Sequence, residues 1–388
     1  MPAEGPAPAR VRPGLEVLLS DSVHLVRGRR VGLVTNQTGV DHQGGSGIDL
    51  LLAAGVRLTA LYSPEHGIRG TADPGAAVAS STDPKTGLPI YSLYGRNSAP
   101  TDSMLANVDL LLVDLQDAGA RYYTYLWTTV EIMRAAQRRQ LPVVVLDRPN
   151  PVGGLVQGNV LDTTWRTPVG LVGVPMRHGM TLGELARLAR HDFGLSTDLT
   201  VIPAAGWTRD RYFDQTGLPF IPPSPNLRSL EALIHYPGTC LFEGTTLSVG
   251  RGTDHAFEQV GAPWLDTARV LASLRTAAPA GVAFQSVTFT PVKPGDGKFA
   301  DTLLAGIRLR VTDRSRYDPS RTALVLLQAI AATGAPVFTS DHRHFQRLVA
   351  QPIDTALYTS GQWTALAATW DAQRAAFLER RKPFLLGY

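Results

Sequence analysis

The chain has 388 residues, of which 44% are hydrophobic and 18% charged, and its formal net charge is +4. This composition predicts a folded chain with a sizeable core and excludes an intrinsically disordered one. The single cysteine, Cys240, excludes an internal disulfide and a cysteine-rich metal site. The arginines are scattered rather than clustered, so we expect no nucleic-acid partner. No apolar run approaches the roughly 20 residues that span a bilayer, so we expect no membrane span.

The first half of the chain alternates strand patterns with helix patterns. Short apolar runs predict strands at residues 31–35, 56–62, 109–114 and 141–146. Helical spacing is found at residues 48–54 and 125–140, and a capping box from Thr181 to Glu184 begins a further helix. This order predicts an α/β fold built on a parallel sheet with helices on both faces.

The second half has a different pattern, which begins after Pro- and Gly-rich segments at residues 222–226 and 236–238. Helices are then predicted near residues 265–277, 320–332 and 363–380, and alternating strands at 285–291 and 305–312. Adjacent strands followed by helices indicate a smaller α+β domain. We therefore expect two domains, residues 14–240 and 241–388.

Polar side chains follow the predicted strands of the first half. Ligands bind beyond the carboxyl ends of the strands in an open parallel sheet, so these residues are expected to share one rim. The rim candidates are Asn36, Gln37, Glu65, His66, Arg69, Gln116, Asp117, Arg121, Tyr123, Asp147, Arg148 and Asn150. Gly and Pro between them indicate sharp turns. Several such loops at one edge predict a binding site.

Glu65 lies directly after an apolar strand, between Pro64 and His66. Partial burial at this position favours the protonated carboxylic acid, which could donate its proton to a leaving oxygen. A glutamate that accepts hydrogen bonds from backbone amides and holds a turn has the same local sequence. The loop by itself leaves both interpretations open.

A second carboxylate, Glu243, precedes the glycine-bounded segment 250–254 near the predicted domain junction. Loops of this kind at a junction are suited to closing over a ligand. Glu243 could instead cap a helix or pair with Arg251. Asp117 and Asp147 also have two interpretations, since each could orient a water molecule or take part in a salt-bridged rim.

Tyr123 belongs to an aromatic run, residues 122–127, that could form a stacking floor for a sugar ring or pack in the core. His178 precedes the capped helix and could reach the rim or serve a structural role. The pair His342 and His344 is too weak a signal for a metal site. Motifs of dinucleotide-binding proteins, P-loop proteins, serine hydrolases and zinc proteases are absent from the sequence.

Taken together, these segments resemble the bacterial exo-β-N-acetylmuramidases of the NamZ type. The matching segments are 32–39 (GLVTNQTG), 63–67 (SPEHG), 87–95 (GLPIYSLYG), 114–121 (DLQDAGAR), 123–125 (YTY), 146–151 (LDRPNP), 177–181 (RHGMT), 223–226 (PSPN), 242–245 (FEGT), 250–253 (GRGT), 261–264 (GAPW) and 298–299 (KF). The resemblance implies a Rossmann-like first domain, a smaller second domain and a cleft between them. It implies a hydrolase that releases terminal β-1,4-linked N-acetylmuramic acid from the non-reducing end of peptidoglycan fragments. We expect this hydrolase to use no metal and no cofactor.

For that reaction we expect Glu65 to be the general acid and Glu243 its partner carboxylate. A separation of about 5 Å between the two carboxyl groups would indicate retention, and roughly 6.5–9.5 Å would leave room for an inverting water. In a third mechanism the substrate's acetamido oxygen is the nucleophile, polarised by Asp117 or Glu243. The sequence does not choose among the three.

The lactyl carboxylate of muramic acid needs a cationic partner, and a guanidinium can bind a carboxylate through two hydrogen bonds. The candidates are Arg69, Arg121, Arg148 and Arg251. Asn226, in one of the matching segments, is a further candidate for substrate binding, as is His178.

Two other functions are consistent with the sequence. One is a non-catalytic cell-wall sugar-binding protein on the same fold, because fold does not determine function. The other is a hydrolase whose metal is held by His66, His178 and carboxylates. Residues 1–17 lack the apolar core of a secretory signal, so we expect a cytoplasmic protein, or a periplasmic or secreted one if a signal has been removed. The sequence does not indicate an oligomeric state.

Overall fold

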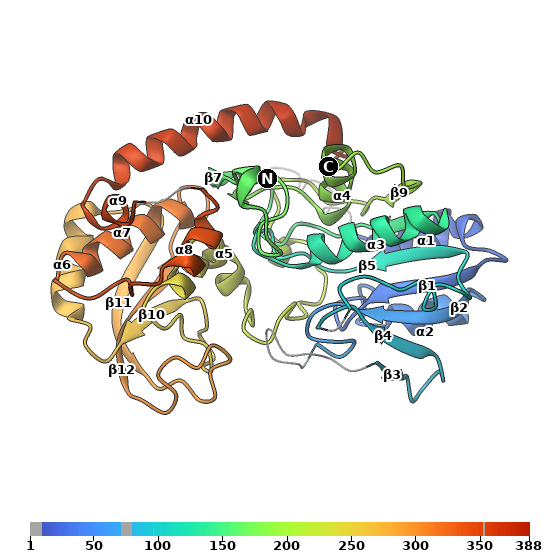
Figure 1. The fold of residues 1–388 in the computed structure, drawn as a ribbon, viewed down its shortest axis with the longest axis horizontal. Helices are drawn as coiled ribbons and strands as arrows, with labels where there is room; N and C mark the ends of the chain where they lie inside the picture. The colour runs from blue at the N-terminus through green and yellow to red at the C-terminus, as the bar shows by residue number, and fades with distance from the viewer. Residues whose placement is uncertain (1–9, 71–79, 96, 352–353) are drawn as a thin grey trace, which may run out of the picture.

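The computed structural model describes residues 10–70, 80–95, 97–351 and 354–388. Residues 1–9 lie outside these ranges, and they form part of the segment, residues 1–17, on which the expectation of no secretory signal is based. Within the described ranges, the first domain is built on a seven-stranded sheet with the order β3-β4-β2-β1-β5-β6-β9 (Figure 1). Its strands are β1 (Arg30–Thr35), β2 (Arg57–Ser63), β3 (Ser81–Thr82), β4 (Pro89–Ser92), β5 (Leu110–Asp114), β6 (Val143–Leu146) and β9 (Leu199–Ile202). Neighbouring strands are parallel except for β3, which pairs antiparallel with β4 at the edge. The predicted parallel sheet is confirmed.

Helices cover both faces of this sheet. On one face lie α1 (Gly14–Asp21) and α2 (Gly47–Ala53), and on the other α3 (Tyr125–Arg139) and α4 (Leu182–Asp192). Strand β5 shows why: Leu110 and Leu112 belong to the core cluster on the first face, whereas Leu111 and Val113 belong to the cluster on the second. Successive side chains of a strand point to opposite faces, so an all-apolar strand needs cover on both.

The second domain contains a three-stranded antiparallel sheet in the order β10-β12-β11. Its elements are α5 (Leu230–Thr239), β10 (Gln259–Ala262), α6 (Thr267–Ala277), β11 (Val282–Phe289), β12 (Leu304–Val311), α7 (Pro319–Ala331), α8 (Arg343–Val349) and α9 (Thr355–Thr359). The predicted smaller α+β unit is therefore confirmed.

Helix α5 is an element that the sequence did not indicate, because Pro237 and Gly238 both disfavour a helix. Ser229 caps its first turn by accepting a hydrogen bond from the backbone N–H of Ala232. Gly238 allows the helix to pack closely on the start of α7, because a Cβ atom there would lie 2.0 Å from the carbonyl oxygen of Pro319. Tertiary packing thus outweighs local propensity in this segment.

The chain returns to the first domain at its carboxyl end. Helix α10 (Trp363–Arg381) runs across the top of the view from the second domain to the first (Figure 1). Arg381 then donates hydrogen bonds to the carbonyl oxygens of His178 and Gly179. The predicted boundary at residue 240 remains a prediction. It falls just before the short helix η4 (Cys240–Gly244), at the end of α5, a helix that packs on α7 of the second domain.

The remaining elements are small. They are the antiparallel pair β7 (Gln157–Val160) and β8 (Pro175–Arg177), and the 3₁₀ helices η1 (Val23–Leu25), η2 (Thr163–Trp165), η3 (Phe213–Gln215) and η5 (Lys382–Phe384). The predicted capping box of α4 is confirmed, with the Thr181 side chain bonded to the backbone of Glu184 and the Glu184 side chain to that of Thr181. No helix in the described ranges is long and apolar enough to cross a membrane.

Candidate active site

A pocket of about 450 Å³ lies between the two domains. The first domain contributes the segments that follow β2 and β4 and the beginning of α3, and the second contributes α5, η4 and α8. Two carboxylates, Glu65 and Glu243, line this pocket from opposite domains. The volume is within the range of about 300–1,000 Å³ typical of small-molecule sites.

Glu65 is placed by a tight turn at the end of β2. The turn has a hydrogen bond from the N–H of Gly67 to the carbonyl of Pro64, and His66 has a positive φ of 73°, which is strained for a residue with a side chain. Glu65 is 9% exposed, and its Oε2 accepts a hydrogen bond of 2.7 Å from Thr124 Oγ1. Burial, the charge of Glu65 and a hydrogen bond with it raise the pKa of Tyr94 to about 12. Two hydroxyl groups therefore orient this carboxyl group.

Glu243 lies on η4 and forms an ion pair with Arg251. The Nε and Nη2 atoms of Arg251 are each 2.6 Å from Glu243 Oε1, and the Cys240 thiol lies 3.4 Å from Oε2. Burial acts to lower the pKa of Arg251, but the Glu243 carboxylate outweighs it and the pKa is raised. The guanidinium also lies over the ring of Phe257, 5.0 Å from its centroid. The pair fixes the position of the Glu243 carboxyl group, and both side chains are largely shielded from water.

Aromatic rings supply much of the remaining wall. Those that line the pocket include Tyr122, Tyr123, Trp127, Tyr236 and Phe257. Tyr123 is 6% exposed, and its hydroxyl donates a hydrogen bond of 2.6 Å to the carbonyl of Pro223. Its ring therefore both packs in the core and faces the pocket, where aromatic surface is suited to the apolar face of a sugar.

The structure brings only some of the predicted site residues to this pocket. Among the described residues, those that line it are Glu65, His66, Tyr123, Glu243 and Arg251. Those that do not are Asn36, Gln37, Arg69, Gln116, Asp117, Arg121, Asp147, Arg148, Asn150, His178 and Asn226. Most members of the second group are engaged by partners elsewhere in the fold.

Two of the predicted arginines are buried within the fold. Arg121 donates hydrogen bonds to the carbonyl oxygens of Asn159, Leu348 and Val349 at 2.7–2.9 Å, which tie the first domain to the end of α8. Burial lowers its pKa. Arg148 pairs with Asp114 through contacts of 2.6 and 3.0 Å. The structure therefore supports a role for both in packing.

Asp147 and Asp117 form structural networks rather than an open rim. Asp147 Oδ2 accepts hydrogen bonds from the hydroxyls of Thr181 and Tyr388, and Oδ1 accepts one from the N–H of Gly183. Burial raises the pKa of Asp147 to about 6. Asp117 Oδ2 accepts a bond from the N–H of Gly119 and lies 3.3 Å from Nε2 of His178.

The edge of the sheet between β1 and β5, where the strand order reverses, is covered by a distant segment. The amide of Gln37 donates a hydrogen bond of 2.9 Å to the carbonyl of Pro222. The side-chain amide of Asn36 donates a hydrogen bond of 2.6 Å to the hydroxyl of Tyr125. The Tyr125 hydroxyl in turn donates a hydrogen bond to the carbonyl of Pro223. The pocket consequently opens beside β2 and β4 instead of at this switch point.

The other predicted binding residues have their own contacts. The side-chain amides of Gln116 and Asn150 each donate a hydrogen bond of 2.9 Å to a carbonyl oxygen, of Pro149 and Met180 respectively. Arg69, whose side chain is 68% exposed, pairs with Asp83 at 3.3 Å. The N–H of Asn226 contacts Ser224 Oγ at 3.5 Å.

Sequence reasoning overlooked Tyr94, Thr124 and His344 as pocket residues. Tyr94 follows β4, a strand that the sequence analysis did not identify, and Thr124 lies in the recognised aromatic run. His344 belongs to the pair with His342, whose spacing does not indicate this pocket. Across the described ranges, no group of three or more His, Cys, Asp or Glu side chains is arranged to hold a metal ion.

Two carboxyl groups on one pocket, one from each domain, are the residue types that a glycosidase uses. The family comparison is specific: this chain belongs to the NamZ family of exo-β-N-acetylmuramidases. The family's amino-terminal model, described as "Exo-beta-N-acetylmuramidase NamZ, N-terminal", matches residues 31–231. Its carboxyl-terminal counterpart matches residues 234–387. The resemblance drawn from the motifs is confirmed.

Individual relatives agree with this family. The chain is 43% identical over 323 residues to the peptidoglycan β-N-acetylmuramidase NamZ of Bacillus subtilis strain 168, a match that covers 83% of this chain and 77% of the relative. Two crystal structures of DUF1343 family proteins from Bacteroides fragilis NCTC 9343 have TM-scores of 0.88 and 0.78. Each is 31% identical to this chain, and each match covers 97% of this chain and 99% of the crystal structure's chain.

Proposed function

We propose that this chain is an exo-acting β-N-acetylmuramidase that releases terminal β-1,4-linked N-acetylmuramic acid from the non-reducing end of peptidoglycan fragments. The observation that carries the proposal is the placement of Glu65 and Glu243, from different domains, on one pocket of about 450 Å³ in a chain of the NamZ family. Paired carboxyl groups that flank a glycosidic bond are the usual catalytic apparatus of glycosidases.

In this proposal Glu65 is the general acid. Its carboxyl group donates a proton to the bridging oxygen as the bond from C1 to that oxygen breaks, so the shortened glycan leaves as an alcohol. Thr124 and Tyr94 hold the carboxyl group in position. Water supplies the hydroxyl that finally bonds to C1, and its remaining proton returns to a carboxylate.

Glu243 is the partner carboxylate. Its ion pair with Arg251 holds the carboxyl group at the pocket wall, from which it can stabilise positive charge at C1. An ionised carboxylate serves as nucleophile in retention, activates water in inversion, or polarises the acetamido group in the substrate-assisted mechanism. The anomer first released by the enzyme, read by proton NMR, separates inversion from the two retaining mechanisms.

The test uses the disaccharide of N-acetylmuramic acid and N-acetylglucosamine and measures release of free N-acetylmuramic acid. Glu65→Gln and Glu243→Gln are each expected to lower kcat by at least about 100-fold, because a general acid contributes 10²–10⁴-fold to the rate. Glu379→Gln, an exposed carboxylate on α10, is the matched control and should keep the wild-type rate. Full activity in both pocket variants would show that the catalytic pair is wrongly assigned.

A further inference from the structure

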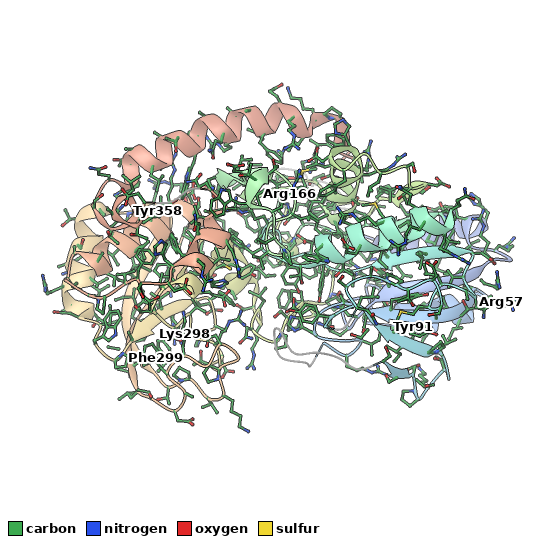
Figure 2. All side chains as sticks on the ribbon, viewed as in Figure 1. Arg57, Tyr91, Arg166, Lys298, Phe299 and Tyr358 are labelled. Carbon is green, nitrogen blue, oxygen red and sulfur yellow. The ribbon has the colours of Figure 1, made fainter. Side chains whose placement is uncertain are left out.

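Lys298 lies outside the pocket lining but is anchored to the backbone that carries Glu243. It belongs to the loop between β11 and β12, and Figure 2 shows Lys298 and Phe299 together in the second domain. Its Nζ donates hydrogen bonds to the carbonyl oxygens of Glu243, Thr245 and Leu247 at 2.9, 2.7 and 2.9 Å. The carbonyl of Phe242 lies slightly farther away, at 3.4 Å.

These contacts match the donor capacity of an ammonium group. An ammonium has three N–H donors, and the three shortest contacts use one carbonyl each. The carbonyls belong to alternate residues that start on η4 with Glu243 and continue past the C-cap residue Thr245 to Leu247. Burial lowers the pKa of Lys298, and the charges of Asp296 and Glu243 act against that effect.

The same loop also supports Arg251, the partner of Glu243. The N–H of Val292 donates a hydrogen bond of 3.0 Å to the carbonyl of Gly252, the residue after Arg251. Gly252 has a φ of 79°, and a Cβ atom there would lie 2.5 Å from the Val292 carbonyl oxygen. The loop therefore contacts the backbone on both sides of the Glu243–Arg251 ion pair.

We propose that Lys298 is a positioning residue for catalysis, whose ammonium group holds the η4 backbone so that Glu243 faces the bound sugar. This inference rests on the proposed function, because it assigns Lys298 a task only if Glu243 acts on the substrate. Lys298 itself takes no part in proton transfer or bond formation.

The test compares Lys298→Met with Lys293→Met in the full-length chain. Lys293 is an exposed lysine of the same loop and provides the matched control. Lys298→Met is expected to lower kcat on the disaccharide by about 100-fold, because a displacement of about 1 Å has that effect on catalysis. KM should change by less than about threefold, since Lys298 does not line the pocket. Lys293→Met should behave as the wild type.

Chemical rescue separates positioning from a loss of folding. In Lys298→Ala, millimolar n-propylammonium is expected to raise kcat at least tenfold, because its ammonium group can bind the carbonyl oxygens that Lys298 contacts in the wild type. The uncharged n-butanol should leave kcat unchanged. If neither compound restores activity and the thermal midpoint has fallen, the role is structural only and the proposal fails.

The remaining outcomes distinguish this proposal from the function on which it rests. If Lys298→Met keeps kcat within threefold of the wild type while Glu243→Gln loses it, the positioning role is wrong and the proposed function stands. If Glu243→Gln is itself fully active, the role of Glu243 is wrong, and that of Lys298 with it.

Discussion

The hydroxyl of Thr124 bonds to Glu65 at 2.7 Å instead of capping the helix that Thr124 begins. Thr124 is the N-cap residue of α3, yet its side chain makes no capping hydrogen bond there. Threonine at an N-cap ordinarily accepts a hydrogen bond from a backbone N–H of the first turn. This hydroxyl is therefore used to orient the proposed general acid rather than to stabilise the helix.

Thr124→Val should consequently impair catalysis more than stability. We expect kcat on the disaccharide to fall about tenfold, at the scale of one lost hydrogen bond, with little change in the thermal midpoint because no capping bond is lost. Steady-state kinetics and a thermal melt measure the two effects. Thr124→Ser keeps the hydroxyl and should retain most activity, and a fully active Thr124→Val enzyme would refute the assignment.

Arg251 is expected to contribute to the preference for muramic acid. Of the four arginines considered for the lactyl carboxylate, all of which the structure describes, it is the one that lines the pocket. Arg251→Lys keeps the charge but not the planar donor geometry, so the ratio of kcat/KM for matched aryl glycosides of N-acetylmuramic acid and N-acetylglucosamine should fall about tenfold. Equal wild-type rates on the two glycosides would remove this idea.

Asp147 predicts a specific pH dependence of stability. Burial raises its pKa in the folded chain to about 6, above the ordinary value of 3.8. Between these values the folded chain retains a proton that the unfolded chain has released, so stability is lost as the pH rises through the window. The free energy of unfolding is therefore lower by about 3 kcal/mol at pH 7 than below pH 4, because the two pKa values differ by about 2 units and each unit corresponds to about 1.36 kcal/mol.

Asp147→Asn should lack this dependence. The wild-type urea midpoint should therefore fall relative to that of the variant between pH 4 and pH 7, as measured by tryptophan fluorescence. Tyr388→Phe removes one donor to the charged carboxylate and should extend the window to higher pH. Parallel midpoints for wild type and Asp147→Asn across this range would contradict the prediction.

Arg148 should contribute to stability rather than to substrate binding. Arg148→Met leaves the buried Asp114 carboxylate without its partner and should cost about 3–5 kcal/mol in the free energy of unfolding. The folded enzyme that remains should keep its KM, because Arg148 does not line the pocket. The exposed pair of Arg343 and Asp341 is the control, and Arg343→Ala should leave the urea midpoint unchanged. A raised KM without lost stability would assign Arg148 to the substrate instead.

Local sequence patterns predicted the elements whose signals are local. The apolar runs of β1, β2, β5 and β6 and the capping box of α4 were identified because side-chain periodicity and capping depend on neighbours a few residues away. Strand β4 and helix α5 were overlooked. The former is short, and the latter contains Pro237 and Gly238, which only packing against α7 accommodates.

The sequence by itself determined the family, the α/β class and the identity of Glu65 and Glu243 as candidate carboxylates. Only the tertiary structure decided which of the polar loops reach the pocket. Asp147 is bonded to Tyr388, 241 residues away, and Arg121 to the carbonyl of Leu348, 227 residues away. A polar residue after a strand has the same local pattern whether it faces a ligand or a distant part of its own chain. The partner that satisfies it is chosen only when the chain folds.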